Sequence, residues 1–181
     1  MPARSFLLVA IAAPGSVEAC IGRVQEGIFA EHGLASAAAL PPLIPVAFLA
    51  GPGSRGLLAA AARSVPYPLR VRTVAVSWEQ GWLFLGVDSG GAWSALRACV
   101  LGAAAAAVEP LFPAAEGFFA GCGEAPPDRR ALIAPALPPL SFSSGSLVLV
   151  DVCCPAGRED WWRSLRWEVV EKKPLRGRRK T

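Results

Sequence analysis

Short apolar runs interrupted by proline and glycine constrain the fold of this chain more than any other feature. The 181 residues are 53% hydrophobic, yet they include 17 prolines and 18 glycines. Two uncharged stretches, residues 33–54 and 131–150, are long enough to cross a membrane as helices, but the prolines within each would break such a helix. We therefore predict strands and loops in both stretches, and no transmembrane segment.

The apolar periodicity predicts strands that alternate with helices. A strand over Phe6–Ala12 is followed by a helix that Ser16 caps and that ends near Gly33. Further helices are expected over Leu57–Ala62 and Trp93–Val108, and further strands over Val46–Leu49, Leu69–Val76, Trp82–Val87, Leu132–Ala136, Leu147–Val152 and Leu165–Val170. A mobile segment is expected over residues 117–127, which are rich in Gly and Pro. This order predicts an α+β domain of two related lobes.

Positive charge is concentrated at the end of the chain. Six basic residues follow Glu171, namely Lys172, Lys173, Arg176, Arg178, Arg179 and Lys180, and they leave twelve basic against fourteen acidic residues before them. We predict one domain over residues 1–171 and a basic, disordered tail over residues 172–181. Any affinity for RNA should then be weak, salt-dependent and carried by the tail, because the body has no broad phosphate-binding face.

The five cysteines are an odd set without the CxxC spacing of a zinc or redox site. We expect reduced thiols and a cytoplasmic protein with no metal and no cofactor. Cys153 and Cys154 are adjacent, but neighbours on a strand point to opposite faces and rarely share a ligand.

Two segments carry a family resemblance. Leu43–Leu49 (LIPVAFL) and Leu132–Ala136 (LIAPA) resemble the His-x-Thr-hydrophobic strands of the 2H phosphoesterases, the 2'-5' RNA ligase or RNA 2',3'-cyclic phosphodiesterase family. Residues 4–10 resemble the first strand of that family, and Leu83–Val87 resembles the strand before its long helix. The resemblance covers residues 4–175 and is one of order and spacing more than of identity.

The resemblance implies a bilobal α+β fold, with mixed or antiparallel sheets around a central groove and helices outside. In the family each lobe contributes one His and one Thr or Ser to a bound phosphate, and the two imidazoles act as acid and base. Carried over by position, these residues fall on Leu43 and Pro45 in the first motif and on Leu132 and Ala134 in the second. An alternative register places Leu140 in the second motif.

None of these side chains can exchange a proton or donate a hydroxyl hydrogen bond. His32 is the single histidine, and one imidazole cannot fill both roles. The sequence therefore predicts a catalytically inactive, monomeric member of the family whose groove retains nucleotide or RNA-end binding. Two alternatives stay open: an active cyclic phosphodiesterase with non-standard residues, and a scaffold domain that binds a partner protein.

Two further clusters are candidate contacts for nucleic acid. Arg129 and Arg130 directly precede the predicted second motif and could contact a phosphate at the mouth of the groove, or could form a solvated turn. Residues 161–167 interleave tryptophans with arginines, a pattern typical of surfaces that stack bases, but equally of a core cluster with an exposed rim.

Overall fold

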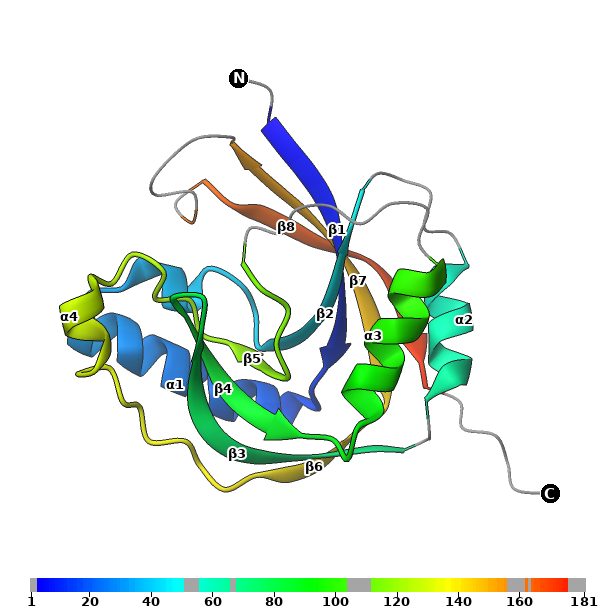
Figure 1. The fold of residues 1–181 in the computed structure, drawn as a ribbon, viewed down its shortest axis with the longest axis horizontal. Coiled ribbons are helices and arrows are strands. Elements are labelled where there is room, and N and C mark those ends of the chain that lie inside the picture. The colour runs from blue at the N-terminus through cyan, green and yellow to red at the C-terminus, as the bar shows by residue number, and fades with distance from the viewer. Residues whose placement is uncertain are drawn as a thin grey trace.

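The computed structural model describes residues 3–50, 56–65, 68–103, 112–155, 162 and 164–175. Its strands form two four-stranded antiparallel sheets (Figure 1). Sheet A has the order β2 (Leu43–Leu49), β1 (Ala3–Ala12), β7 (Ser146–Pro155) and β8 (Arg166–Pro174). Sheet B has the order β5 (Gly117–Phe119), β4 (Trp82–Asp88), β3 (Leu69–Glu79) and β6 (Ser141–Ser144). The predicted α+β class is confirmed.

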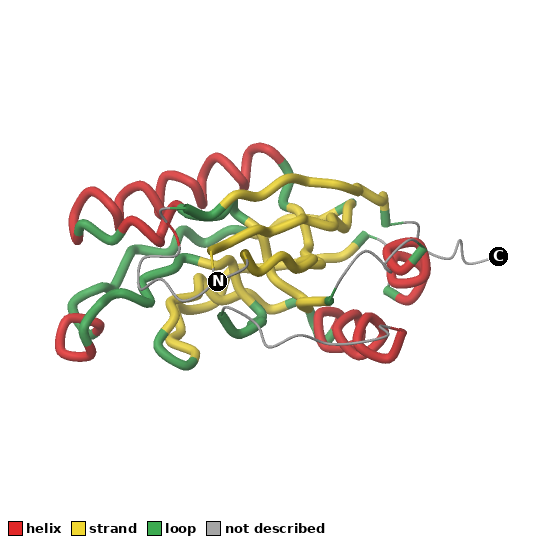
Figure 2. Tube along the Cα trace, turned by 90° about the horizontal axis from the view of Figure 1, so that it is seen from above, coloured by secondary structure: helices red, strands yellow, loops and turns green. Residues whose placement is uncertain are grey.

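The helices lie outside the sheets. They are α1 (Gly15–His32), α2 (Leu57–Ser64), α3 (Ala92–Ala103) and α4 (Pro127–Arg130), with a 3-10 turn η1 (Ala35–Ala38) after α1. Figure 2 shows α1 on one side of the strands and α2 with α3 on the opposite side. None of the described helices is long and apolar enough to cross a membrane.

The first helix shows how the sequence sets these boundaries. Its residues Val17, Ile21 and Ile28 recur at helical spacing and are buried. The helix ends at Gly33, which takes the left-handed conformation (φ 71°) and donates its N–H to the carbonyl of Phe29 at 2.8 Å. The predicted cap is wrong, because Pro14 occupies the N-cap position and Ser16 lies inside the first turn.

Two predictions for the middle of the chain are also wrong. Residues 117–122, predicted to be mobile, are buried and contain strand β5. The strand predicted over Leu132–Ala136 does not form, because turn bonds run from Leu132 N–H to the Arg129 carbonyl and from Ile133 N–H to the Arg130 carbonyl. The prolines of this segment also lack the N–H that a ladder requires, and the Leu132 side chain is 73% exposed.

The last described strand runs past Glu171. β8 continues through Lys172 and Lys173 to Pro174, and the side chain of Leu175 is buried. The Leu175 N–H donates to the Gly145 carbonyl at 2.7 Å. The strand therefore extends beyond the domain boundary predicted after Glu171. Residues 176–181, like the predicted helix beyond Ala103, lie outside the described part of the chain.

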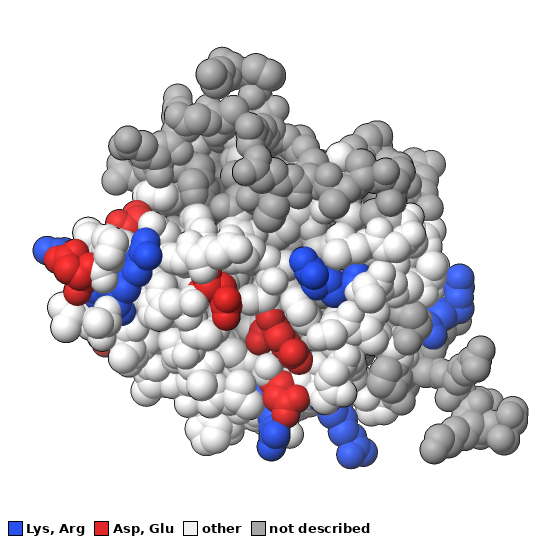
Figure 3. Space-filling view, in the orientation of Figure 1, with Lys and Arg blue, Asp and Glu red and all other residues white. Residues whose placement is uncertain are grey.

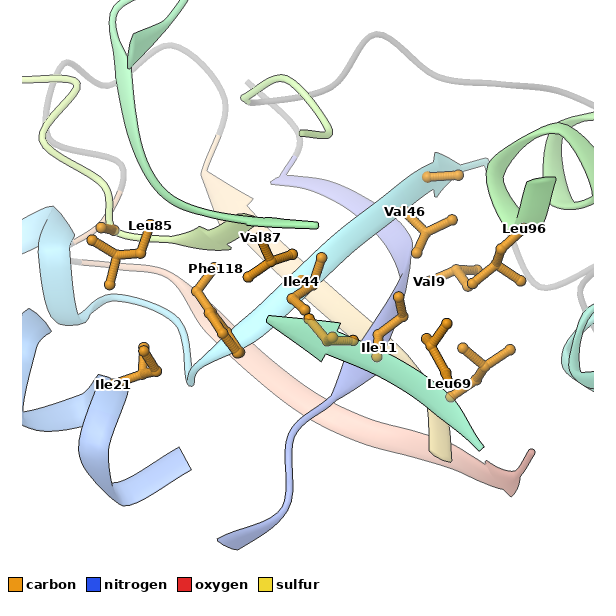
Figure 4. Close-up of a cluster of buried hydrophobic side chains, with 14 of the residues drawn as sticks. Val9, Ile11, Ile21, Ile44, Val46, Leu69, Leu85, Val87, Leu96 and Phe118 are labelled. Atoms are coloured by element: carbon orange, nitrogen blue, oxygen red, sulfur yellow. The ribbon is translucent and has the colours of Figure 1, made fainter. Parts of the chain in front are cut away.

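Buried side chains form two clusters. The larger cluster joins the helices to the sheets, with Ile21 of α1 beside Phe118 and Leu85 of sheet B, and Leu96 of α3 beside Val9 of sheet A (Figure 4). The second cluster, called the inner cluster here, joins the two sheets to each other. Its members are Phe6, Leu8, Ala10, Leu40, Leu43, Phe48, Phe84, Phe112, Phe119, Val148, Val150, Val152 and Cys154.

Candidate functional site: the inner faces of the two edge strands

Strand β2 presents apolar groups to the inner cluster. Leu43 pairs with Ala12 and Pro45 with Ala10, so the two residues lie on one face of sheet A. A register shift between Val9 and Ala10 follows, and beyond it Phe48 returns to the same face as Leu43. The Leu43 side chain is buried.

Strand β5 is the counterpart of β2 in the other sheet. Each is an edge strand, β2 beside β1 and β5 beside β4, and the two edge strands contact each other. Gly117 pairs with Gly86 and Phe119 with Phe84, so Gly117 and Phe119 form an inward-facing pair two residues apart, as Leu43 and Pro45 do. The second inward pair of the fold is thus at 117 and 119.

Position 117 has little room for any side chain. A Cβ atom added to Gly117 would lie 3.0 Å from the Leu85 carbonyl oxygen and 3.1 Å from the Gly86 Cα, closer than ordinary van der Waals contact. Two of the three nearest atoms belong to backbone, which cannot rotate away as a flexible side chain could. A histidine at this position would therefore require the strands to move apart.

A continuous set of aromatic rings fills the space between the inner faces. Phe112 links the two sheets, because its ring centroid lies 4.9 Å from Phe48 of β2 and 4.0 Å from Phe119 of β5. Phe6 extends the set into sheet A at 5.3 Å from Phe48, and Phe84 extends it into sheet B at 5.8 Å from Phe119. Each such pair contributes about 0.5–1.5 kcal/mol beyond the area that it buries.

The architecture matches solved structures of phosphoesterases, although no family model and no curated protein matches the sequence. The Thermus thermophilus protein TT0787 aligns with 96% of this chain and 100% of its own, with a TM-score of 0.60 at 21% identity. E. coli LigT, complexed with NADP+, aligns over 93% and 96% of the two chains with a TM-score of 0.61 at 16% identity. A third structure, described as a phosphoesterase, aligns over 95% and 99% with a TM-score of 0.57 at 14% identity.

The chain has the 2H phosphoesterase fold. Within this fold, the residues predicted for the first motif, Leu43 and Pro45, lie on β2, whereas those predicted for the second motif lie outside the strands. Leu132 and Ala134 lie in the irregular segment after α4, and both side chains are exposed. Leu140 precedes β6, where its N–H donates to the Thr73 hydroxyl at 2.8 Å. The one signal for the correct strand is the apolar pair Phe118-Phe119 after Gly117, which is short and flanked by Gly and Pro.

Polar groups at the ends of β4 and β5 serve the architecture of the 2H fold. The Glu116 carboxylate accepts from the Ser89 N–H at 2.8 Å, and the Ser89 hydroxyl in turn accepts from the Trp93 N–H at the start of α3. The Trp93 indole N–H donates to the Pro45 carbonyl at 2.9 Å, so this network ties α3 to β2. Glu116 precedes Gly117, but its carboxylate is engaged in this network.

A second network holds β5 against α1 and η1. The buried Gln25 amide donates to the Phe119 carbonyl at 2.8 Å. Beyond β5, Glu124 accepts from the backbone N–H of Ser36 at 2.9 Å and bonds the Ser36 hydroxyl, which also accepts from the Cys122 N–H at 2.7 Å. Burial, and secondarily the charge of Glu124, raises the pKa of the Cys122 thiol to about 12. This thiol is therefore unreactive near neutral pH.

The charged candidates lie apart from the inner cluster. The Arg130 guanidinium stacks 5.7 Å from the ring of Trp78 and donates to the Ala125 carbonyl, whereas Arg129 is exposed. Lys172 is exposed, and Lys173 pairs with Glu171 at 3.4 Å. Arg176, Arg178, Arg179 and Lys180 lie outside the described residues. The face drawn in Figure 3 carries scattered charges of both signs among uncharged residues.

The remaining candidates from the sequence divide between core and surface. The His32 side chain is 29% exposed at the end of α1, with the Glu31 carboxylate 4.0 Å away. Trp162 packs against the inner cluster, whereas Trp167 of β8 is 43% exposed. Among the described residues, no group of three or more His, Cys, Asp or Glu side chains could hold a metal ion.

Proposed function

We propose that this protein is a catalytically inactive 2H-fold protein that acts by binding a partner and does not cleave phosphate esters. The observation that carries the proposal is the chemistry of the two inward pairs, Leu43 with Pro45 and Gly117 with Phe119. The same observation makes an active cyclic phosphodiesterase with non-standard residues the weaker alternative. The five free cysteines support the further proposal of a cytoplasmic protein, and we propose that it is monomeric.

The chemistry of the family requires two groups that exchange protons near neutral pH. General acid and general base catalysis contribute factors of about 10² to 10⁴ for each positioned group. Neither inward pair includes a group that titrates, and a Cβ atom at position 117 would already lie 3.0 Å from the Leu85 carbonyl oxygen. His32 lies on α1, and a single imidazole could supply one role at most.

Retained nucleotide binding between the sheets is also disfavoured on physical grounds. E. coli LigT has been solved with 3'-AMP and with NADP+, which makes a nucleotide the natural ligand to consider for this fold. In the present chain a phosphate between β2 and β5 would lie against Leu43, Phe48 and Phe119, where nothing on the two inward pairs could replace its hydration. Burying an unpaired charge in such surroundings costs several kcal/mol. A protein partner that binds elsewhere is therefore the function that the geometry favours.

The test is hydrolysis of a 2',3'-cyclic nucleotide and of a 2',3'-cyclic-phosphate RNA end at neutral pH, with an active 2H phosphoesterase as positive control. We expect no turnover above the level of the matched His32→Ala variant. Turnover that copurifies with the chain at constant specific activity, and that falls on Glu116→Gln, would contradict the proposal because it would assign catalysis to a carboxylate beside β5.

A further inference from the structure

A surface groove follows the second half of α1, and we call it the α1 groove. It consists of two adjacent cavities of about 340 and 430 Å³, each large enough for part of a small ligand or a short peptide. Glu31, His32 and Leu132 line both cavities. The first cavity is completed by Leu34, Ala125, Pro126, Arg129 and Ile133, and the second by Arg23, Val24, Gly27, Ile28, Ala134, Pro135 and Ala136.

A glycine in the middle of α1 keeps this groove open. A Cβ atom added to Gly27 would meet no heavy atom within 4 Å, so the space above this residue is empty. Glycine in a helix interior is about 1 kcal/mol less favourable than alanine, and no backbone feature requires it here because the helix is regular through position 27. The absence of a side chain leaves the partly buried Val24 accessible from solvent, whereas Ile28 forms part of the buried floor.

The opposite wall presents an exposed leucine. Leu132 is 73% exposed, the largest exposure among the large hydrophobic side chains of the described residues, and it lies where the two cavities meet. Two turn hydrogen bonds fix the backbone that carries Leu132. They run from the Leu132 N–H to the Arg129 carbonyl and from the Ile133 N–H to the Arg130 carbonyl. An apolar side chain held in this way between two cavities of mixed polar and apolar lining is suited to cover an apolar group of a ligand whose other groups are polar.

The charges on the rim favour an acidic partner. Arg23 lines one cavity and Arg129 the other, and within the described residues neither guanidinium has an ion-pair partner. Glu31 is the single acid among the residues that line the groove. A carboxylate at either end of a ligand would find an exposed guanidinium that is free to form a bidentate pair.

We propose that the α1 groove binds a short extended segment of a partner protein, with two or more apolar residues flanked by acidic ones. The nine-residue interval from Arg23 to His32 spans about 14 Å of helix, which matches about four residues of extended chain. The apolar residues lie over Gly27 and against Leu132, and the flanking carboxylates pair with Arg23 and Arg129. This inference extends the proposed role in binding, and it does not depend on the absence of hydrolysis.

The experiment is selection of phage-displayed random heptapeptides against the full chain, followed by dissociation constants for the enriched peptides. We expect sequences with acidic residues on both sides of an apolar pair. Gly27→Leu fills the groove and should weaken their binding at least tenfold. The matched control is Gly102→Leu on α3, where an added Cβ also meets nothing within 4 Å, and it should leave binding unchanged.

Arg23→Glu provides a second variant that leaves the shape of the groove intact. It should weaken the acidic peptides severalfold, and more strongly at low salt than at high salt. The proposal is overturned if no peptide is enriched, if the enriched peptides lack acidic residues, or if they bind the Gly27→Leu variant as tightly as the wild-type chain. Enrichment with this pattern would support the α1 groove even if the chain proved to hydrolyse cyclic phosphates.

Discussion

Glycine has opposite structural effects beside the inner cluster and in the α1 groove. Gly117 lies where two strands and their side chains leave almost no room for a Cβ atom, so its lack of a side chain permits close packing of β5 on β4. Gly27 lies where nothing approaches within 4 Å, so its lack of a side chain leaves an open cavity. The space between β2 and β5, called the closed region here, is filled by packed side chains, whereas the groove along the outside of α1 is open.

The largest expected effect concerns the closed region. Phe119→Ala removes a fully buried ring that contacts Phe112, Phe84 and Trp82, and we expect the free energy of unfolding to fall by about 3–5 kcal/mol. Urea unfolding measures the change. Phe29→Ala is the matched control, because Phe29 is half exposed on α1 and its loss should change stability by about 0.5 kcal/mol or less. Equal losses in the two variants would mean that the rings do not form a packed core.

A smaller change tests the crowding at position 117. Gly117→Ala adds one methyl group against the Leu85 carbonyl and the Gly86 Cα, and such overpacking typically destabilises a protein by about 1–3 kcal/mol. The midpoint of urea unfolding should decrease without a change in its slope. A variant as stable as the wild-type chain would show that β4 and β5 can separate, and that the position could accept a larger side chain.

The opposite sign is expected for the same substitution at position 27. Gly27→Ala adds a methyl group in open space within a helix, and we expect the free energy of unfolding to rise by about 0.4–1 kcal/mol. Thermal and urea unfolding of the Gly117→Ala and Gly27→Ala variants under identical conditions provide the comparison. If the two changes had the same sign, the contrast between the closed region and the open groove would be lost.

The smallest effect concerns the rim of sheet B. The Gly90 N–H first, and the Arg72 guanidinium second, hold the pKa of the Asp88 carboxyl below its ordinary value. Because the folded pKa is depressed, this pair stabilises the protein above the ordinary carboxyl pKa, and the stabilisation is lost as the pH falls through the folded pKa. Asp88→Asn should therefore be slightly less stable than wild type at pH 7 and equal to it in strong acid. A difference independent of pH would show that the carboxylate charge is irrelevant.

The sequence predicts an element well where the signal lies within that element, and poorly where the element depends on pairing with a distant strand. The helix around Ile21 and the two strands β3 and β4 are predicted from local periodicity, and all three are confirmed. A short strand over Val46–Leu49 is predicted from its apolar run, and the structure extends this strand back to Leu43. β5 has three residues and acquires its strand character from pairing with β4, thirty residues earlier in the chain, so local patterns did not indicate it.

The sequence likewise did not indicate the inward pair on β5. Residues 132–136 offer more apolar character than residues 117–119, and the sequence prediction therefore assigned the second motif to Leu132 and Ala134. The prolines that follow Ala134 remove backbone donors, and this excluded a paired strand despite the hydrophobic composition. The α1 groove could not be predicted either, because Gly27 in the sequence looks like a weak point of a helix and reveals nothing of the space above it.

Nuclear magnetic resonance titration with 3'-AMP tests the central claim most directly, because it reports on the space between β2 and β5 itself. With methyl and aromatic resonances assigned, we predict no saturable shift of the Leu43 methyls or of the Phe48 and Phe119 rings at millimolar nucleotide, since these groups are packed against one another. Saturable shifts of these three residues, with a common dissociation constant, would contradict the account by showing that the closed region opens to admit a phosphate.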